Sequence, residues 1–182
     1  MSDNGTTIHS QARSSPGELS EDAILTTHKI LGAFGRDARS IEILHADLFD
    51  SRPRIAISAL QALGRIRDPR SFGYISRLFR HSDPEIACSA VRASGEIGAP
   101  DALQVLLKLS ANRREEVVQL EILRTLAGLS PDSPEVNQLA ATLCGSRTVQ
   151  REIRVTLYQL YKDQGQTDKA LDQLQQLIVG QE

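Results

Sequence analysis

The residues of this chain most able to do chemistry are its four histidines, its carboxylates and its two cysteines. The histidines, His9, His28, His45 and His81, form no H-x-x-x-H or His-Glu arrangement, the spacings from which helical metal sites are built. The chain also lacks G-x-S-x-G, P-loop, G-x-G-x-x-G and C-x-x-C motifs. The carboxylates are spaced like those of a solvated helix surface. We therefore predict a protein that is not an enzyme and holds no metal or cofactor.

The composition is that of an ordinary folded chain. Of the 182 residues, 40% are hydrophobic and 24% charged, and the net charge of −2 argues against nucleic acid or membrane as the main partner. No apolar run reaches the length of a transmembrane helix, and the N-terminus has no apolar signal segment. Cys88 and Cys144 fall within helical patterns and are expected to be small buried residues in a reducing cytoplasm. The predicted localisation is cytoplasmic, without membrane insertion.

Positive charge is concentrated in residues 50–81, which hold seven arginines and two aspartates. Within this segment Arg70, Tyr74, Arg77 and His81 follow one another at i, i+4, i+7 and i+11, which predicts one stripe along a helix. Arginine and tyrosine are enriched among the residues that dominate binding at protein interfaces. The stripe is therefore a candidate partner-binding surface, and the alternative is a solvated helix face.

The elements that would position this stripe come from a sequence repeat. Two segments coincide at an offset of 31 residues, with the pairs Ser51/Ser82, Pro53/Pro84, Ile55/Ile86, Ser58/Ser89, Ala59/Ala90, Gly64/Gly95 and Ile66/Ile97. A period of this size predicts a solenoid of stacked helical units, each of which buries its apolar face against its neighbours.

Each copy of the repeat predicts two helices. Ser51 and Ser82 are expected to cap the first helix, and the proline two residues later fits its first turn. Apolar residues every three or four positions, Leu63 among them, give this helix a buried face. The second helix starts at Asp68-Pro69, and its predicted buried residues are Phe72, Ile75, Leu78 and Phe79.

The pattern extends to both sides of the doubled segment. It predicts one array over residues 20–182, with repeats at about 20–50, 51–81, 82–113 and 114–145 and a terminal hairpin over 146–180. Ser20 opens the first unit, whose first helix is expected to be amphipathic through Ile24, Leu25, Leu31 and Phe34. This unit is predicted to be a terminal cap that turns one face to water. Residues 1–19 are polar and aperiodic and are predicted to be a disordered tail.

A family resemblance rests on these residues. The Asp83-Pro84-x-Ile86 opening, the Ala-Leu-Gly-x-Ile run of residues 62–66 and the following Asp-Pro resemble the HEAT-like repeat in its short bacterial, phycobilin-lyase-type form. This resemblance implies an all-α, right-handed solenoid of about five antiparallel helix pairs, with the second helices on the concave surface. That surface would carry the stripe together with Gln104 and Lys108. The family's usual arginine after the first-helix Val or Ile is replaced by Ala56, Ala87 and Gln119, so its polar ladder between repeats is not expected.

The last unit differs from the others. Tyr158, Tyr161, Gly165 and Ala170, followed by Leu171, Leu174 and Leu177, resemble a tetratricopeptide hairpin, in which Gly165 would shape the turn and Ala170 would pack against the first helix.

Three function classes remain open. The favoured one is a non-catalytic scaffold, adaptor or regulatory subunit that binds another protein on its concave second-helix face. The second is an anionic-polymer binder that uses the arginines of residues 50–81 to contact nucleic acid. The third, implied only by the repeat resemblance, is a tetrapyrrole lyase or chaperone subunit.

Overall fold

The computed structural model describes residues 19–112, 115–130, 133–143, 154–159, 161–162 and 165–179, and these contain helices and no strand. The all-α fold class is confirmed. The α-helices are α1 Glu21–Phe34, α2 Ala38–Asp47, α3 Pro53–Ile66, α4 Phe72–Ile75, α5 Pro84–Ile97, α6 Ala102–Asn112, α7 Glu116–Leu129, α8 Pro134–Leu143 and α10 Thr167–Val179. Two 3₁₀ helices, η1 Pro69–Ser71 and η2 Ser76–Arg80, flank α4, and residues 154–159 and 161–162 are also helical. The predicted disordered tail lies, except for Leu19, outside the described residues.

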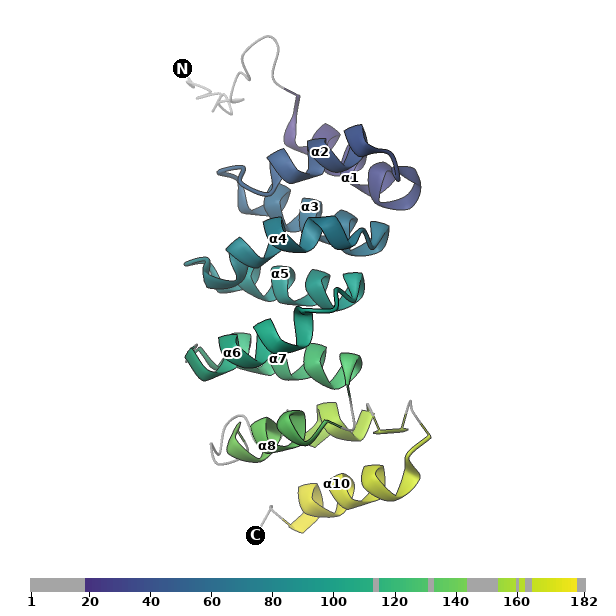
Figure 1. The fold of residues 1–182 in the computed structure, drawn as a ribbon, viewed down its shortest axis with the longest axis vertical. Helices are drawn as coiled ribbons and strands as arrows, with labels where there is room; N and C mark the ends of the chain where they lie inside the picture. Colours follow the sequence, from purple (N-terminus) through teal and green to yellow (C-terminus); the bar gives the residue numbers. More distant parts are fainter. Residues whose placement is uncertain are drawn as a thin grey trace, which may run out of the picture.

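The helices stack as consecutive pairs along the long axis of the molecule (Figure 1), with α1 and α10 at opposite ends. The first helices form a continuous row in which α3 packs between α1 and α5, and α5 packs between α3 and α7. The second helices lie beside this row, with α2 against α3, η2 and α4 against α5, and α6 against α7. Each helix pair therefore buries its apolar face against the next pair, as a solenoid requires.

The hydrophobic core follows the predicted periodicity. Leu63 is fully buried, and Val118, Ile122 and Leu126 occupy the equivalent face of α7 without exposure. In the second helix of residues 51–81, Ile75, Leu78 and Phe79 are buried and Phe72 is partly buried. Cys88 is buried as predicted, whereas Cys144 lies outside the described residues.

Helix starts differ from prediction at two of three serines. Ser20 caps α1, since its hydroxyl accepts a hydrogen bond from the Ala23 amide at 3.3 Å. The caps predicted at Ser51 and Ser82 are wrong: the N-cap of α3 is Arg52, whose side chain does not cap the helix, and that of α5 is Asp83, which accepts from the Glu85 amide. The reason is that a proline takes the first helical position, so the residue directly before it becomes the cap.

The ends of α3 and α5 are equivalent in backbone and different in residue type. Arg67 ends α3 in the left-handed conformation with φ 59°, and Gly98 ends α5 with φ 66°. Glycine adopts this conformation without steric cost, whereas a side chain at Cβ makes it unfavourable. The left-handed position at the end of the first helix is therefore an arginine in one repeat and a glycine in the next.

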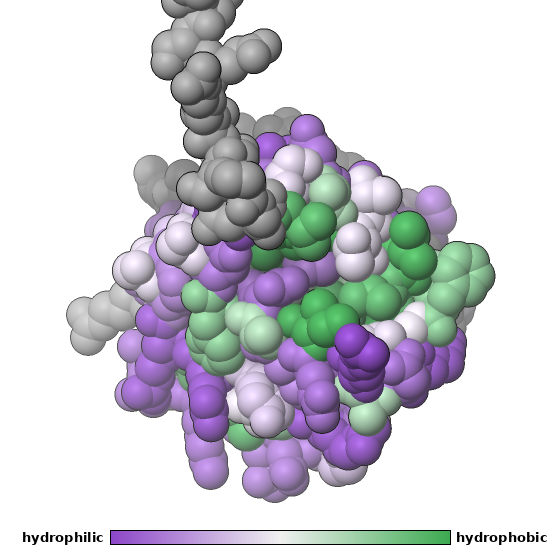
Figure 2. All heavy atoms as spheres, turned by 90° about the horizontal axis from the view of Figure 1, so that it is seen from above, coloured by the Kyte–Doolittle hydropathy of each residue, from purple (hydrophilic) through white to green (hydrophobic). Residues whose placement is uncertain are grey.

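The face that the first helix pair turns to water carries apolar side chains. Phe34, expected on the amphipathic face of α1, is 83% exposed, and Ile30 and Ile43 are also exposed. Figure 2 looks onto this end of the stack and shows hydrophobic side chains at its surface. Since α1 has a neighbouring first helix, α3, on one side only, part of its apolar surface is left open. His28 and Gly32 are the residues of α1 that are buried.

The second element of residues 51–81 is the largest local departure from prediction. A continuous helix was expected there, but the chain runs through η1, the four-residue α4 and η2. The Ser76 hydroxyl donates to the Gly73 carbonyl at 3.1 Å, and the His81 amide bonds to the Leu78 carbonyl three residues earlier. Ser and Gly are weak helix formers, and a 3₁₀ turn has three residues in place of 3.6. The stripe predicted from α-helical spacing is therefore rearranged.

The C-terminal hairpin docks on α8. The Tyr161 hydroxyl donates a hydrogen bond to Asn137 Oδ1 at 3.1 Å. Gly165 turns the chain with φ 72°, and Ala170 is 4% exposed. Both observations agree with the roles predicted for these two residues.

Candidate partner-binding surface

Tyr74, Arg77 and Arg80 form one basic row on the second-helix surface. The Arg77 guanidinium carbon lies 5.6 Å from the centroid of the Tyr74 ring, in a cation–π contact. Arg77 and Arg80 belong to η2, and residues three apart on a 3₁₀ helix are eclipsed. Tyr74 contacts Arg77 and is itself 42% exposed.

His45 of α2 also contacts Tyr74. The two rings stack with centroids 3.9 Å apart and an interplanar angle of 16°. His45 Nε2 lies 2.9 Å from the Ser71 hydroxyl. Burial lowers the pKa of His45 and Arg70 lowers it further, while Asp68 and Glu42 act in the opposite direction. The row is thus built across two repeats, on a histidine that sequence spacing alone did not connect to it.

Arg70 and His81, which were predicted to share the stripe, have other roles. The Arg70 guanidinium pairs with Asp68, with an Nη2 to Oδ2 distance of 2.6 Å and a second contact through Nε. This pairing holds the pKa of Asp68 below its usual value. His81 is half-buried, and its Nδ1 accepts a hydrogen bond from the Asp83 amide at 3.0 Å, which orders the turn into α5. The structure therefore brings Tyr74 and Arg77 together.

A groove of about 480 Å³ adjoins the row between η2 and α6. Its apolar lining is Phe79 from η2 with Val105 and Leu109 from α6. Arg80 and Lys108 supply one cation from each side. Gln104, the other residue predicted on α6, is exposed but does not line the groove.

The charge of the groove and row is not neutralised locally. In the part of the chain that the structure describes, no ion pair involves Arg77, Arg80 or Lys108. Arg52 pairs with Asp50 at 2.7 Å and lowers the pKa of that carboxyl to about 2, and Arg54 pairs with Glu21 at 3.0 Å. The excess of arginine in residues 50–81 therefore overstates the free positive charge. Among the described ion pairs of this segment's arginines, none involves Arg65, Arg67, Arg77 or Arg80. Arg77 and Arg80 lie at the basic row and the groove, whereas Arg65 and Arg67 lie at the end of α3.

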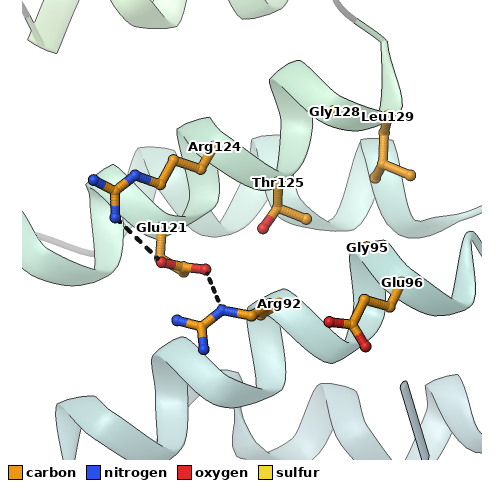
Figure 3. Close-up of a pocket in the computed structure, with 8 residues that line it drawn as sticks. All are labelled: Arg92, Gly95, Glu96, Glu121, Arg124, Thr125, Gly128 and Leu129. Atoms are coloured by element: carbon orange, nitrogen blue, oxygen red, sulfur yellow. Dashed lines mark hydrogen bonds and ion pairs between the residues drawn. The ribbon is translucent and has the colours of Figure 1, made fainter. Parts of the chain in front are cut away.

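A second hollow, of about 350 Å³, lies between α5 and α7 (Figure 3). Glu121 is buried there between Arg92, whose Nε donates to it at 2.9 Å, and Arg124 at 3.8 Å. Arg124 also donates to the Thr156 hydroxyl at 3.3 Å. These contacts form a polar ladder between units at positions other than those where the HEAT-like pattern usually carries arginine. Arg92, Glu121 and Arg124 pair with one another and so link the two helices, whereas Glu96, which also lines the hollow, has no ion pair drawn to it in Figure 3.

The described residues contain no group of three or more His, Cys, Asp and Glu side chains placed to hold a metal ion. No described helix combines the length and hydrophobicity needed to cross a bilayer.

Residues 41–127 match the family model for HEAT repeats. The match runs from within α2 to near the end of α7 and includes the basic row and the groove. HEAT repeats are typical of proteins that bind other proteins. Neither the comparison with curated proteins nor that with solved structures gave a match.

Sequence reasoning missed two contributors to this surface, His45 and Arg80. Arg80 would have emerged if residues 74, 77 and 80 had been read at the three-residue period of a 3₁₀ helix. No comparable signal exists for His45, because its contact with Tyr74 joins residues from different repeats.

Proposed function

We propose that this chain is a non-catalytic interaction scaffold that docks another protein across the basic row and the adjoining groove. One observation carries the proposal: Arg77, Arg80 and Lys108, free of ion pairs within the described residues, lie beside an exposed tyrosine and an apolar groove. Arginine and tyrosine contribute disproportionately to binding energy at protein interfaces. The HEAT repeats over residues 41–127 support a role in protein binding.

The same surface is a poor fit to an extended polyanion. Nucleic-acid affinity comes largely from many cations along the phosphate backbone, but three other arginines of residues 50–81 already pair with Asp50, Asp68 and Glu21. The whole chain has a net charge of −2. A groove lined by Phe79, Val105 and Leu109 favours a partner with apolar side chains.

The test is capture of the native partner from cell extract by the tagged chain and by an Arg77→Glu/Arg80→Glu variant. Arginines at interface hot spots each contribute about 2 kcal/mol or more, so the variant is expected to lose capture. Its melting temperature should change little, since surface substitutions alter stability by about 0.5 kcal/mol or less. The matched control is Arg36→Glu/Arg65→Glu, which changes the net charge equally at exposed residues outside the row and groove.

Several results would overturn the proposal. One is normal capture by the Arg77→Glu/Arg80→Glu variant. Another is binding to heparin or DNA that collapses with added salt, which would show an anionic-polymer binder. A third is a stoichiometric spectral change on titration with a bilin, which would indicate a tetrapyrrole lyase or chaperone subunit in place of a scaffold.

A further inference from the structure

We infer that the groove between η2 and α6 binds an acidic peptide segment that inserts one bulky apolar side chain between two carboxylates. The inference rests on the proposed function, because it names the chemistry of the partner that the second-helix surface would dock. It commits to a segment of another protein as the occupant. The argument uses the shape of the groove, its charges and its continuity with the basic row.

The centre of the groove accepts an apolar side chain. Phe79 and Leu109 are 3% and 5% exposed, so they form a packed floor, and the half-buried Val105 forms part of the wall. The volume of about 480 Å³ falls within the range of pockets that hold small organic groups. An aliphatic or aromatic side chain that enters the groove removes its own apolar surface from water and covers the half-buried Val105, while Phe79 and Leu109 have little surface left to cover.

The sides of the groove select negative charge. Arg80 comes from η2 and Lys108 from α6, so the cations stand on two different elements. The described residues that line the groove include no carboxylate. The polar neighbours Ser76 and Asn112 already donate to the carbonyls of Gly73 and Lys108. The two cations are thus the main donors left for a ligand, and charge-assisted hydrogen bonds to carboxylates are among the stronger polar contacts.

The basic row extends this preference beyond the groove. Arg77 is eclipsed with Arg80 on η2, and Tyr74 supports Arg77 from one side. A peptide that continues out of the groove along η2 therefore meets a third cation and an aromatic edge. A few discrete cations around an apolar floor match a few carboxylates around an apolar anchor. A phosphate backbone, by contrast, needs a continuous cationic track and stacking platforms.

The experiment is selection of a random peptide display library on the full immobilised chain. Enriched peptides are then measured as synthetic peptides by fluorescence anisotropy. We expect sequences that combine Asp or Glu with one large apolar residue. Lys108→Glu is expected to weaken them at least about tenfold, as for the loss of an interfacial hot spot. Lys29→Glu, an equal change of charge at an exposed residue of α1, should bind as the unchanged chain does.

The inference is overturned if the library yields no enriched peptide, or if the enriched peptides are neutral or basic. Normal binding of the enriched peptides to the Lys108→Glu variant would also overturn it. So would peptides that heparin displaces but that do not compete with the native partner. A chain that is dimeric and becomes monomeric with Lys108→Glu would show that a second copy occupies the groove. Capture of the native partner that depends on Arg77 and Arg80 but not on Lys108 would preserve the proposed function and remove this inference alone.

Discussion

The imidazole of His45 stacks on the phenol ring of Tyr74 with centroids 3.9 Å apart, although the two residues belong to different helix pairs. His45 lies on α2 and Tyr74 on α4, so the contact joins the first pair to the second. Arg77 covers Tyr74 in turn. The position of the basic row is therefore set by the stacking of repeats as well as by the local conformation of its own segment.

The His45 contact predicts a pH dependence of stability. The pKa of His45 in the folded chain lies below its ordinary value of 6.5, chiefly because of burial. On acidification the unfolded chain takes up this proton first, so His45 lowers the free energy of unfolding as pH falls below 6.5. Its contribution is intact above 6.5 and is lost towards the lower folded-state pKa.

The measurement is chemical denaturation of the unchanged chain and of His45→Phe at several pH values. Phenylalanine keeps an aromatic ring against Tyr74 but cannot titrate. The unchanged chain should therefore lose more stability than the variant over the interval below pH 6.5. Parallel pH profiles would contradict this role for His45.

Replacing Arg67 by glycine should stabilise the protein. Arg67 has φ 59° at the end of α3, in the left-handed region that Gly98 occupies at the end of α5. The left-handed conformation costs a non-glycine residue roughly 1 kcal/mol. We expect Arg67→Gly to raise the free energy of unfolding by up to about 1 kcal/mol, and Gly98→Ala to lower it by a similar amount. A loss of stability in Arg67→Gly would mean that the arginine side chain contributes more than the strain costs.

Gly32 allows α1 to approach α3 closely. A Cβ atom at Gly32 would lie 3.0 Å from Ala62 Cα, a backbone atom that moves only with the helix. At Gly128 of α7 an added Cβ meets no described atom within 4 Å. Both glycines lie within helices, so alanine brings the same gain in helix propensity, about 1 kcal/mol.

Thermal or chemical unfolding of Gly32→Ala and Gly128→Ala compares these sites directly. Gly128→Ala should be more stable than the unchanged chain. Gly32→Ala should be less stable than Gly128→Ala by about 1–3 kcal/mol, the cost of overpacking a close contact. Equal gains from both substitutions would show that α1 shifts freely on α3.

The sequence predicted the stacked helix pairs because burial repeats along the chain at helical spacing. Ile55, Leu63 and Ile86 lie where that period put them, all nearly unexposed. The 3₁₀ segment was not predicted, because the apolar residues around Gly73 and Ser76 follow α-helical spacing. The low helix propensity of these two residues is a weaker signal than that spacing. The exposure of Phe34 depends on which helices pack against α1. A repeat pattern in the sequence does not show which face of the first helix pair is left without a neighbour.

The candidate site was predicted in part from the sequence. Tyr74 and Arg77 were predicted from residue type and helical spacing, and Lys108 from the position that the repeat resemblance implies for the second helices. Tyr74 and Arg77 lie at the row, and Lys108 lies at the groove. The pairing of Arg70 with Asp68, two residues away, was not predicted. An ion pair between residues close in sequence neutralises a surface charge. The count of arginines in residues 50–81, on which the prediction rested, does not show this pairing.

Leu63→Asp should unfold more than one helix pair. Leu63 is fully buried in α3, which packs against both α1 and α5. An unpaired carboxylate in this position costs several kcal/mol, comparable to the total stability of a small domain. Gln61→Asp, at an exposed residue of the same helix, is the control and should be nearly neutral. The readout is hydrogen exchange along the chain, and protection lost only within α3 would contradict coupling between the pairs.

The Arg92–Glu121 pair should stabilise the fold more than the Arg54–Glu21 pair. The Glu121 side chain is 10% exposed and the Glu21 side chain 33% exposed, with Arg–Glu distances of 2.9 and 3.0 Å. The lengths are nearly equal, so the difference tests burial. Water screens the more exposed pair, for which about 0.2–1 kcal/mol is expected. A charged hydrogen bond to a buried carboxylate contributes about 1.5–3 kcal/mol.

Double-mutant cycles with alanine at each pair isolate these coupling energies from the effects of the single substitutions. We expect the Arg92–Glu121 coupling to be the larger and to persist in high salt, since burial limits screening. The Arg54–Glu21 coupling should fall towards zero as salt is added. Equal couplings that fall together would show that Glu121 is effectively solvated. The polar ladder of α5 and α7 would then set the alignment of the helices without contributing to stability.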